Sequence, residues 1–322
     1  MVGPSEKLPV VLGTAVPSSN NTNLKTFGWE LELMWKDRLN NGLNYSARFT
    51  LADSRTKITR YSNPSGLIDG FYAGKYVGEI WGYETIGIAQ SDQEMAEHIG
   101  RLINGGQSNL GQDWKAGDIM YKDLNEDGKI DAGSHTLQDH GDLKRIGNST
   151  PRYNVGLELA ADWKGFDIRM FWQGTLKRDY FQGSYYFWGA NGRQGPWFST
   201  ALKGHDDYFR NDEASPLGTN LNSYYPRPLF NTDKNQQSQT KYLQDASYLR
   251  LKNLQIGYSL PHNIVQKMGM QHLRIFASGE NLFTITSLID FFDPESIEGG
   301  SWGHGNVYPL SRTFSFGLNV TF

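Results

Sequence analysis

Residues 313–322 read Thr-Phe-Ser-Phe-Gly-Leu-Asn-Val-Thr-Phe. Apolar side chains stand at every second position and small or polar residues stand between them, which predicts a β-strand with one apolar and one polar face. The apolar face carries Phe314, Phe316, Leu318, Val320 and Phe322. A tilted strand of about ten residues is long enough to cross a bilayer. The remaining sequence has to distinguish a membrane strand from a strand of a soluble sandwich.

The composition favours an all-β chain with many turns. The 322 residues include 36 glycines, only 38% are hydrophobic, and 13% are aromatic. No run of about 18 apolar residues exists, so no transmembrane helix is expected. The chain has no cysteine, which excludes disulfides and thiolate metal sites. Its net charge of −3 gives no indication of a nucleic-acid partner.

Six further segments alternate in the same way, so the sequence predicts seven strands. They are Gly28–Trp35, Leu43–Leu51, Tyr153–Ala160, Phe166–Gln173, Tyr248–Leu260 and Leu273–Glu280. The apolar phase of the segment 248–260 slips by one residue near Lys252 and Asn253, and this slip predicts a β-bulge. Between the second and third strands, Ser91 and Glu94 form a capping box in front of a short helix that ends near Leu102.

The connections between these strands alternate in length. Those after the first, third and fifth strands are short, and the others span residues 61–150, 180–245 and 287–311. Short turns at one rim and long loops at the other are typical of outer-membrane barrels. The polar strand faces also carry charges that suit a water-filled lumen, namely Glu30, Glu32, Arg48, Glu158, Asp167, Arg169, Arg274 and Glu280.

We therefore predict an antiparallel up-and-down transmembrane β-barrel segment with long extracellular loops. Bacterial single-chain barrels have even strand numbers, so seven strands indicate part of a larger barrel. In this orientation the apolar face of 313–322 contacts lipid, and Phe322 lies at the periplasmic rim, where the assembly machinery would read it. The alternative hypothesis is a soluble calcium-binding β-protein that binds carbohydrate.

Several motifs, spread in order over nearly the whole chain, resemble one known family. The chain is similar to the SusC/RagA-type TonB-dependent outer-membrane transporters. The motifs are Lys-Thr-Phe-Gly-Trp-Glu-Leu-Glu-Leu at 25–33, Val-Gly-Glu-Ile-Trp-Gly-Tyr-Glu-Thr at 77–85, Gly-Asp-Ile-Met-Tyr-Lys-Asp-Leu-Asn-Glu-Asp-Gly-Lys-Ile-Asp at 117–131, Ile-Gly-Asn-Ser-Thr-Pro-Arg-Tyr at 146–153, Ala-Ser-Tyr-Leu-Arg-Leu-Lys-Asn-Leu at 246–254 and Ala-Ser-Gly-Glu-Asn-Leu-Phe-Thr at 277–284.

The resemblance implies that residues 1–322 are the C-terminal part of a transporter in the cell outer membrane, with a complete barrel of about 22 strands. It implies import of oligosaccharides or peptides, a SusD-like surface lipoprotein as partner, and energy from TonB through an N-terminal part that is absent here. It also implies no enzymatic activity. No nucleophile elbow, P-loop or dinucleotide fingerprint occurs in the sequence.

An acidic loop lies within 118–134 of the first long connection. Asp123, Asn125, Asp127, Lys129 through its backbone carbonyl, and Asp131 occupy the positions that supply oxygen ligands in calcium loops. Gly128 would make the sharp turn, and Ile130 would hold the loop to its surroundings. Ser134 stands where a bidentate carboxylate is needed, so Asp118 or a water would have to replace that ligand. The alternative is an acidic turn whose Asp and Asn side chains bind their own backbone.

Aromatic residues in the second long connection form the candidate substrate site. Tyr185, Tyr186, Trp188 and Trp197 could stack against sugar rings if their faces are exposed. The alternative is that these side chains pack within the loop or form a girdle at the membrane interface.

Overall fold

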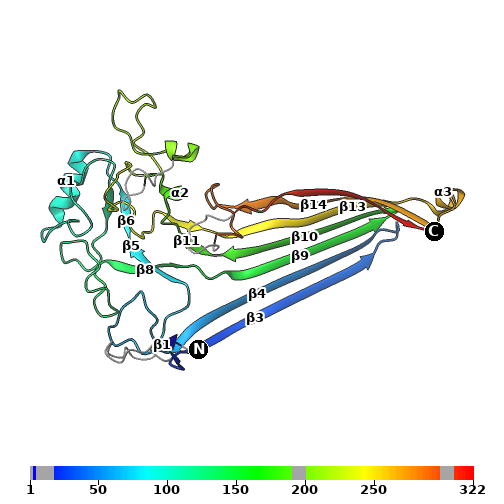
Figure 1. Cartoon of the computed structure of the whole chain (residues 1–322), viewed down its shortest axis with the longest axis horizontal. Coiled ribbons are helices and arrows are strands. Elements are labelled where there is room, and N and C mark those ends of the chain that lie inside the picture. The colour runs from blue at the N-terminus through cyan, green and yellow to red at the C-terminus, as the bar shows by residue number, and fades with distance from the viewer. Residues whose placement is uncertain (1–2, 5–17, 191–200, 298–307) are drawn as a thin grey trace.

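Seven long strands lie side by side in a single sheet (Figure 1), in the order β15-β14-β13-β10-β9-β4-β3. The computed structural model describes residues 3–4, 18–190, 201–297 and 308–322. The long strands are β3 (Asn23–Arg38), β4 (Asn44–Arg60), β9 (Arg152–Trp163), β10 (Phe166–Lys177), β13 (Tyr248–Ser259), β14 (His272–Thr286) and β15 (Thr313–Thr321). Every neighbouring pair is antiparallel.

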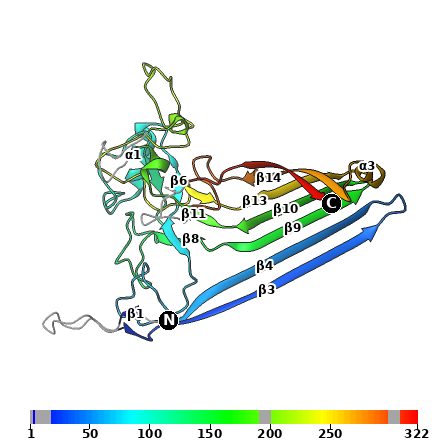
Figure 2. The same cartoon turned by 45° about the vertical axis from the view of Figure 1, so that its right-hand side comes forward.

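The sheet follows an up-and-down path, as predicted. The connections after β3, β9 and β13 are short and lie at one end, whereas those after β4, β10 and β14 are long and gather at the other end (Figures 1 and 2). Among the described residues, β3 and β15 each pair on one side only. The predicted segment of an antiparallel up-and-down barrel is therefore confirmed.

The register of the sheet produces one continuous apolar face. A single row across it pairs Leu33 with Phe49, Phe49 with Leu157, and Leu157 with Trp172. The row continues from Trp172 to Leu251. Because the side-chain period of a strand is two, this register fixes the faces of the other residues in the sheet, with a change of phase where the register shifts in β13. The alternation in the sequence therefore correctly predicted which side chains share a face.

The apolar side chains of β15 are among the most exposed in the molecule. Phe314, Phe316, Leu318 and Val320 are 69%, 84%, 64% and 41% exposed, and the chain-terminal Phe322 is 82% exposed. A soluble sandwich would bury such a face against a second sheet. In the described residues, the other sheets have two strands each, and all but the pair of β1 (Gly3–Pro4) and β2 (Ser18–Ser19), which precedes β3, belong to the connections between the long strands.

Ion pairs between strands cross the opposite face of the sheet, which we call the inner face. Arg48 of β4 lies 2.9 Å from Glu32 of β3 and 3.9 Å from Glu158 of β9. Arg274 of β14 reaches over β13 to Asp167 of β10 at 2.6 Å. This reach depends on Gly257, because a Cβ atom there would lie 2.4 Å from the Arg274 guanidinium.

The predicted β-bulge is present. The β13–β14 register shifts between Leu251 and Asn253, and the β10–β13 register shifts between Phe171 and Trp172. The long strands are also longer than the alternation alone indicates, and β3 begins at Asn23 rather than at Gly28. The mostly polar residues of the extensions of β3 and β4 interrupt the alternation, but they continue the backbone ladder.

The described parts of the long connections fold into a separate packed region, which we call the loop region (residues 61–151, 178–190, 201–247, 287–297 and 308–312). Its elements are β5 (Glu79–Tyr83), β6 (Thr85–Ile88), α1 (Asp92–Arg101), β7 (Ile119–Tyr121), β8 (Leu143–Asn148), β11 (Asp179–Phe181), α2 (Tyr185–Trp188), the 3-10 helix η3 (Lys203–Asp206) and β12 (Leu243–Asp245). Outside it lie β1 (Gly3–Pro4), β2 (Ser18–Ser19) and α3 (His262–Lys267). No helix in the described ranges is long and apolar enough to cross a membrane.

The main hydrophobic core lies in the loop region and not in the sheet. Its buried residues include Tyr121, Ile130, Phe187 and Tyr242, and none of its members belongs to the seven long strands. Helix α1 begins as predicted, since the Ser91 hydroxyl accepts a hydrogen bond from the Glu94 amide. The loop region is therefore a folded unit and not a set of flexible tethers.

Candidate functional site

The acidic loop lies inside the loop region, and two of its predicted features are confirmed. Gly128 has a φ of +79°, which favours glycine, and its amide donates to Asp123 Oδ2 at 2.8 Å. Ile130 is fully buried in the main core, and its amide donates to the Gly106 carbonyl at 2.7 Å. The turn and the hydrophobic anchor therefore fix the backbone of the acidic loop against the main core.

The oxygens of this loop are partly satisfied by the protein itself. Asn125 Oδ1 accepts from the Asp127 amide, and Asp127 Oδ1 accepts from the Lys129 amide. The Lys129 ammonium lies 2.5 Å from Asp131 Oδ2 and 3.7 Å from Asp127 Oδ2. In contrast, Asp123 Oδ1 is buried and has no hydrogen-bond partner. Across the described ranges, no three His, Asp or Glu side chains converge closely enough to hold a metal ion.

Asp142 is the acidic residue of this site that the sequence analysis missed. It is fully buried, and its carboxylate accepts from the Leu124 amide at 2.7 Å and from the Asp131 amide at 2.9 Å. Burial raises the pKa of Asp142, and the neighbouring charge of Asp123 adds to this rise. A buried carboxylate beside a second carboxylate is the environment that a bound cation would stabilise.

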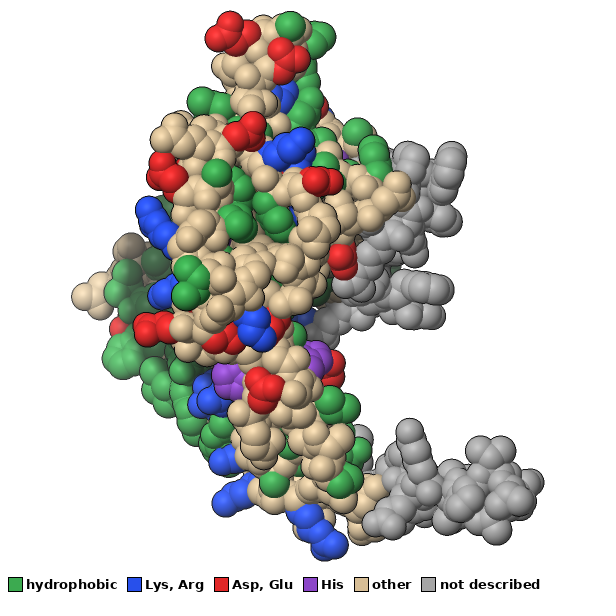
Figure 3. Space-filling view, turned by 90° about the vertical axis from the view of Figure 1, so that its left-hand side faces the viewer, with side chains coloured by type: hydrophobic (Ala, Val, Ile, Leu, Met, Phe, Trp, Pro, Cys, Tyr) green, Lys and Arg blue, Asp and Glu red, His purple; other side chains and the backbone are tan. Residues whose placement is uncertain are grey.

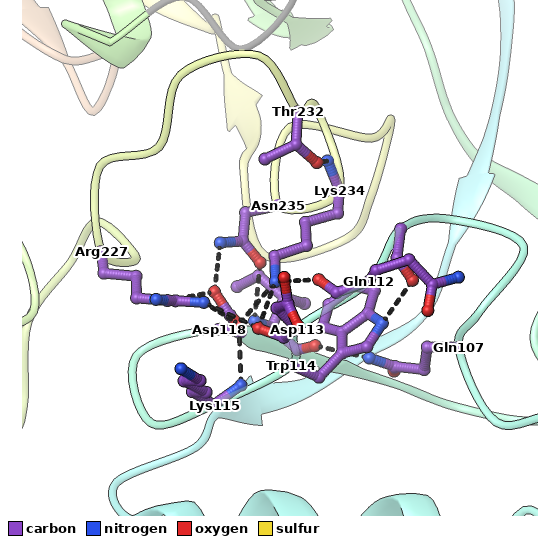
Figure 4. A network of polar contacts seen from close by, with 12 residues as sticks. Gln107, Gln112, Asp113, Trp114, Lys115, Asp118, Arg227, Thr232, Lys234 and Asn235 are labelled. Carbon is purple, nitrogen blue, oxygen red and sulfur yellow. Dashed lines mark hydrogen bonds and ion pairs between the residues drawn. The ribbon is translucent and has the colours of Figure 1, made fainter.

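Asp118 does not supply the missing ligand, contrary to one of the two sequence-based suggestions. Its carboxylate is fully buried and lies in a polar network that includes Arg227 and Lys234 (Figure 4). Arg227 donates to both of its oxygens at 2.7 Å, the Lys234 ammonium lies 2.9 Å from Oδ2, and Asn235 donates to Oδ1 at 2.8 Å. Both carboxylate oxygens of Asp118 therefore already have partners. These contacts link the first long connection to the second.

In this network, burial and the contacts with charged partners act in opposite directions on the pKa values of Asp118 and Lys234. Burial on its own would raise the pKa of Asp118, but the hydrogen bonds from Arg227, Asn235 and Lys234 outweigh it and hold this pKa below its ordinary value. Burial lowers the pKa of Lys234, although Asp118 opposes the shift. The Lys234 ammonium also lies 4.6 Å from the centre of the Trp114 ring. The network is a structural clamp, and its integrity depends on an ionised Asp118.

The predicted aromatic platform differs from expectation at Trp188. This side chain is only 6% exposed, because it packs edge-on against Phe187, Tyr225 and Tyr242. Trp188 therefore belongs to the loop packing that was the alternative interpretation. Tyr186 is partly buried against the same core. Trp197 and the side chain of Tyr185 lie outside the described part of the chain.

A cavity of about 440 Å³ nevertheless lies beside Trp188. Tyr208, Tyr225 and Pro226 contribute to its wall, and so does Arg227 of the clamp. Its volume is within the range of small-molecule sites. The described part of the second long connection thus contains a partly open cavity with aromatic residues in its wall.

Curated relatives match the chain over almost its whole length. It is 27% identical to TonB-dependent receptor P3 of Formosa agariphila over 337 residues, covering 98% of this chain and 30% of the relative. It is 23% identical to TonB-dependent receptor P26 of the same organism, covering 98% of this chain and 31% of that protein. The chain therefore spans about a third of the length of these relatives. No family model matches it.

Solved structures share its fold. A chain in the structure of the RagAB peptide transporter superposes with a TM-score of 0.67 at 22% identity, covering 98% of this chain and 31% of that one. A chain of the RagAB peptide importer in the open-open state gives a TM-score of 0.65 at 21% identity, covering 100% of this chain and 31% of that one. The resemblance to SusC/RagA-type TonB-dependent transporters that the motifs indicated is confirmed.

Proposed function

We propose that the chain forms the C-terminal part of the barrel of a TonB-dependent importer in the outer membrane. The observation that carries this proposal is the sheet with one apolar and one charged face. Its apolar face has no second sheet to pack against in the described residues, and it suits lipid. Its charged inner face suits an aqueous lumen. The similarity to TonB-dependent receptors supports this role.

In this role the strands form a wall of the import pathway and carry out no covalent chemistry. The imported solutes are oligosaccharides or peptides, and the loop region forms the extracellular part of the solute chamber. TonB acts through a part of the protein outside this chain. The relatives are receptors and transporters, which is consistent with a role other than catalysis.

A SusD-like surface lipoprotein is the partner that we propose for the loop region. Figure 3 looks onto this end of the molecule, where apolar side chains are exposed among charged ones. Ile86, Ile103 and Leu217 are 57%, 84% and 56% exposed. These apolar side chains are available for contact with such a partner.

We further propose that Ca²⁺ binds the acidic loop as a structural ion. Asp123, Asn125, Asp127, Asp131 and the Lys129 carbonyl remain the proposed ligands, and buried Asp142 replaces the carboxylate that Ser134 lacks. The unpartnered Asp123 Oδ1 supports this proposal, because a buried carboxylate oxygen without a donor is costly. Binding requires the Lys129 ammonium to leave Asp131. The ion would stabilise the loop region and take no part in chemistry.

The decisive experiment for the import proposal is fractionation of the complete protein expressed from its own gene. We expect the protein in the outer membrane, resistant to extraction with urea and monodisperse only in detergent. Uptake of its solute should be lost when TonB is deleted. A monodisperse protein without detergent would instead favour the soluble calcium-binding and carbohydrate-binding alternative.

A further inference from the structure

The apolar face of the sheet ends in positive charge where β3 and β4 reach the loop region (Figures 1 and 2). On β3, Trp29 and Phe27 are the last apolar side chains of this face, and Lys25 follows them. On β4, Arg55 pairs with Phe27 and Lys57 pairs with Lys25, and the register has no shift between this end and the middle of the sheet. Directly opposite residues of antiparallel strands point to the same side of a sheet. All three cations therefore lie on the apolar face, and we call them the cationic patch.

The described residues leave the charge of this patch without a partner. None of its three cations has an ion pair in the described part of the chain. Asp53, which precedes Arg55 on the same face of β4, instead accepts two hydrogen bonds from the Arg152 guanidinium. Lys25 and Lys57 stand directly opposite each other, and like charges in this position destabilise a sheet. The fold thus holds together positive charges that a bound anion would stabilise.

Tyr76 positions the two cations of β4. It follows β4 in the first long connection and pairs with Lys57, while the Val77 amide donates to the Thr56 carbonyl at 2.9 Å. The centre of the Tyr76 ring lies 5.2 Å from the guanidinium carbon of Arg55 and 5.6 Å from the Lys57 ammonium. A cation is attracted to the face of an aromatic ring. Side chains that are already held in place lose less conformational entropy when they bind a ligand.

A cavity of about 360 Å³ continues the positive charge beside the patch. Arg55 forms part of its wall, and Arg145 and Lys177 add two further cations. The Arg145 side chain is 61% exposed. The two carboxylates in the wall, Glu79 and Asp179, each accept a hydrogen bond from a backbone amide. The patch and the cavity together therefore offer more positive than negative charge to an anion.

The patch lies on a face that a complete barrel would leave open. Strands that complete a barrel would join β3 and β15 within the plane of the sheet, and β4 already has neighbours on both sides. In the proposed function the apolar face is the outside of the barrel wall, so the lumen and its contents lie on the opposite face. Just beyond the hydrocarbon, the outside of such a wall meets the lipid headgroups.

We propose that the cationic patch binds a phosphorylated lipid headgroup of the outer leaflet, with Arg55 and Lys57 on the phosphate oxygens and the acyl chains on the apolar face. This inference rests on the proposed barrel function. An arginine fork matches the geometry of a phosphate group. The occupant is a lipid because the apolar face begins directly beside the patch, and only a molecule with both a phosphate and acyl chains complements both surfaces.

The test is native mass spectrometry of the purified complete protein, released from detergent and titrated with lipid. The probes are lipid A with two phosphates, phosphatidylethanolamine as a lipid without net charge, and inorganic phosphate as a competitor. We expect lipid A to bind more tightly than phosphatidylethanolamine, and its binding to weaken as the salt concentration rises. Arg55→Gln combined with Lys57→Gln should weaken lipid A binding by about thirtyfold. Arg55→Lys combined with Lys57→Arg keeps both charges and should retain it.

Lys36→Gln combined with Arg169→Gln is the matched control. It removes the same charge from the inner face, where one row pairs Lys36 with Ser46, Ser46 with Ala160, and Ala160 with Arg169. Lipid A binding should be unchanged in this variant. The comparison of the two lipids and the salt dependence use the wild type, so they test the inference whether or not the variants fold.

Three results would overturn the inference: lipid A binds no more tightly than phosphatidylethanolamine, neutralising the patch has no more effect than the control, or an equal concentration of inorganic phosphate displaces lipid A. None of them affects the import proposal, which depends on membrane localisation and TonB-dependent uptake. Conversely, lipid A binding at the patch of a membrane protein that imports nothing would support the inference and refute the import proposal alone.

Discussion

The sheet and the loop region bury their hydrophobic side chains in opposite ways. In the loop region, Tyr121, Phe187 and Tyr242 are packed in a core and protected from solvent. In the sheet, Phe316 and Leu318 point away from the protein and are 84% and 64% exposed. The loop region buries apolar side chains in a core, whereas the sheet exposes its apolar side chains on one face.

The charged groups of the two regions also differ in their burial. Asp118 in the loop region is fully buried and has four hydrogen-bond or ion-pair partners within the clamp and its own turn. The corresponding ion pairs of the sheet, such as Arg48 with Glu32, lie on an open face with side chains 46% and 55% exposed. Because solvent screens exposed charges, we expect charge to matter for stability in the loop region and apolar character to matter in the sheet.

The largest effect is expected for Asp118→Ala in the loop region. It leaves Lys234 buried without its carboxylate, which should destabilise the loop region by about 3–5 kcal/mol. Denaturant unfolding and limited proteolysis of the protein in detergent would measure this. Glu97→Ala on the surface of α1 is the control, and Asp118→Ala combined with Lys234→Met should recover part of the loss. If Asp118→Ala and Glu97→Ala had the same free energy of unfolding, the clamp would not stabilise the loop region.

The next effect is expected for Phe316→Arg on the apolar face of β15. An arginine facing hydrocarbon should cost about 2–4 kcal/mol. The cost would be measured by folding into lipid vesicles. Ser315→Arg is the matched control, because Ser315 pairs with Ser278 on the inner face. If both substitutions reduced folding equally, the assignment of the two faces would be wrong.

Calcium should stabilise the loop region by a smaller amount. At a free concentration 100 times the dissociation constant, a bound ligand contributes about 2.7 kcal/mol. We expect Asp127→Ala and Asp142→Asn to lower the melting temperature only when Ca²⁺ is present. Asp139→Asn, which removes a nearby carboxylate outside the proposed ligand set, serves as the control. Identical melting of all variants with and without Ca²⁺ would exclude the site.

The calcium effect should also depend on pH. Burial raises the pKa of Asp142, so this ligand takes up a proton at a higher pH than an ordinary aspartate. The ion needs the ionised form, so its stabilisation should disappear as the pH falls through this raised pKa. Without Ca²⁺ the sign reverses, because the folded state holds the proton more tightly and its burial penalty is relieved on acidification. Melting curves across pH would separate the two cases, and a calcium effect independent of pH would exclude Asp142 as a ligand.

The smallest effect is expected for Arg48→Gln on the inner face of the sheet. Its ion pairs are exposed and screened, so we expect unfolding in detergent to be unchanged within error. The same denaturant titration as for Asp118→Ala would measure it. A loss comparable to that of Asp118→Ala would remove the distinction between the two regions.

Local sequence was sufficient to predict the sheet. The period of two in residues 313–322 indicated a strand with two distinct faces, and the phase slip at Lys252 and Asn253 indicated the bulge. Ser91 and Glu94 likewise marked the start of α1. Each of these signals depends on residues within a few positions of one another, where spacing translates directly into geometry.

The loop region was harder to predict because its contacts are distant in sequence. Lys234 reaches Asp118 across 116 residues, and nothing near either residue indicates the pairing. Asp142 lies beyond the usual length of a calcium loop, although an acidic residue directly before β8 was a signal that could have been used. Trp188 was considered as an exposed platform because composition alone does not distinguish loop surface from loop core.

The edge strand β15 contains no charged residue, whereas Arg274 and Asp167 join three strands at once over Gly257. Separating β13 from either neighbour therefore breaks an ion pair as well as a ladder of backbone hydrogen bonds. Peeling β15 from β14 breaks no ion pair along the strand itself. Backbone hydrogen bonds and side-chain contacts along a register of nine residues therefore hold β15 to β14.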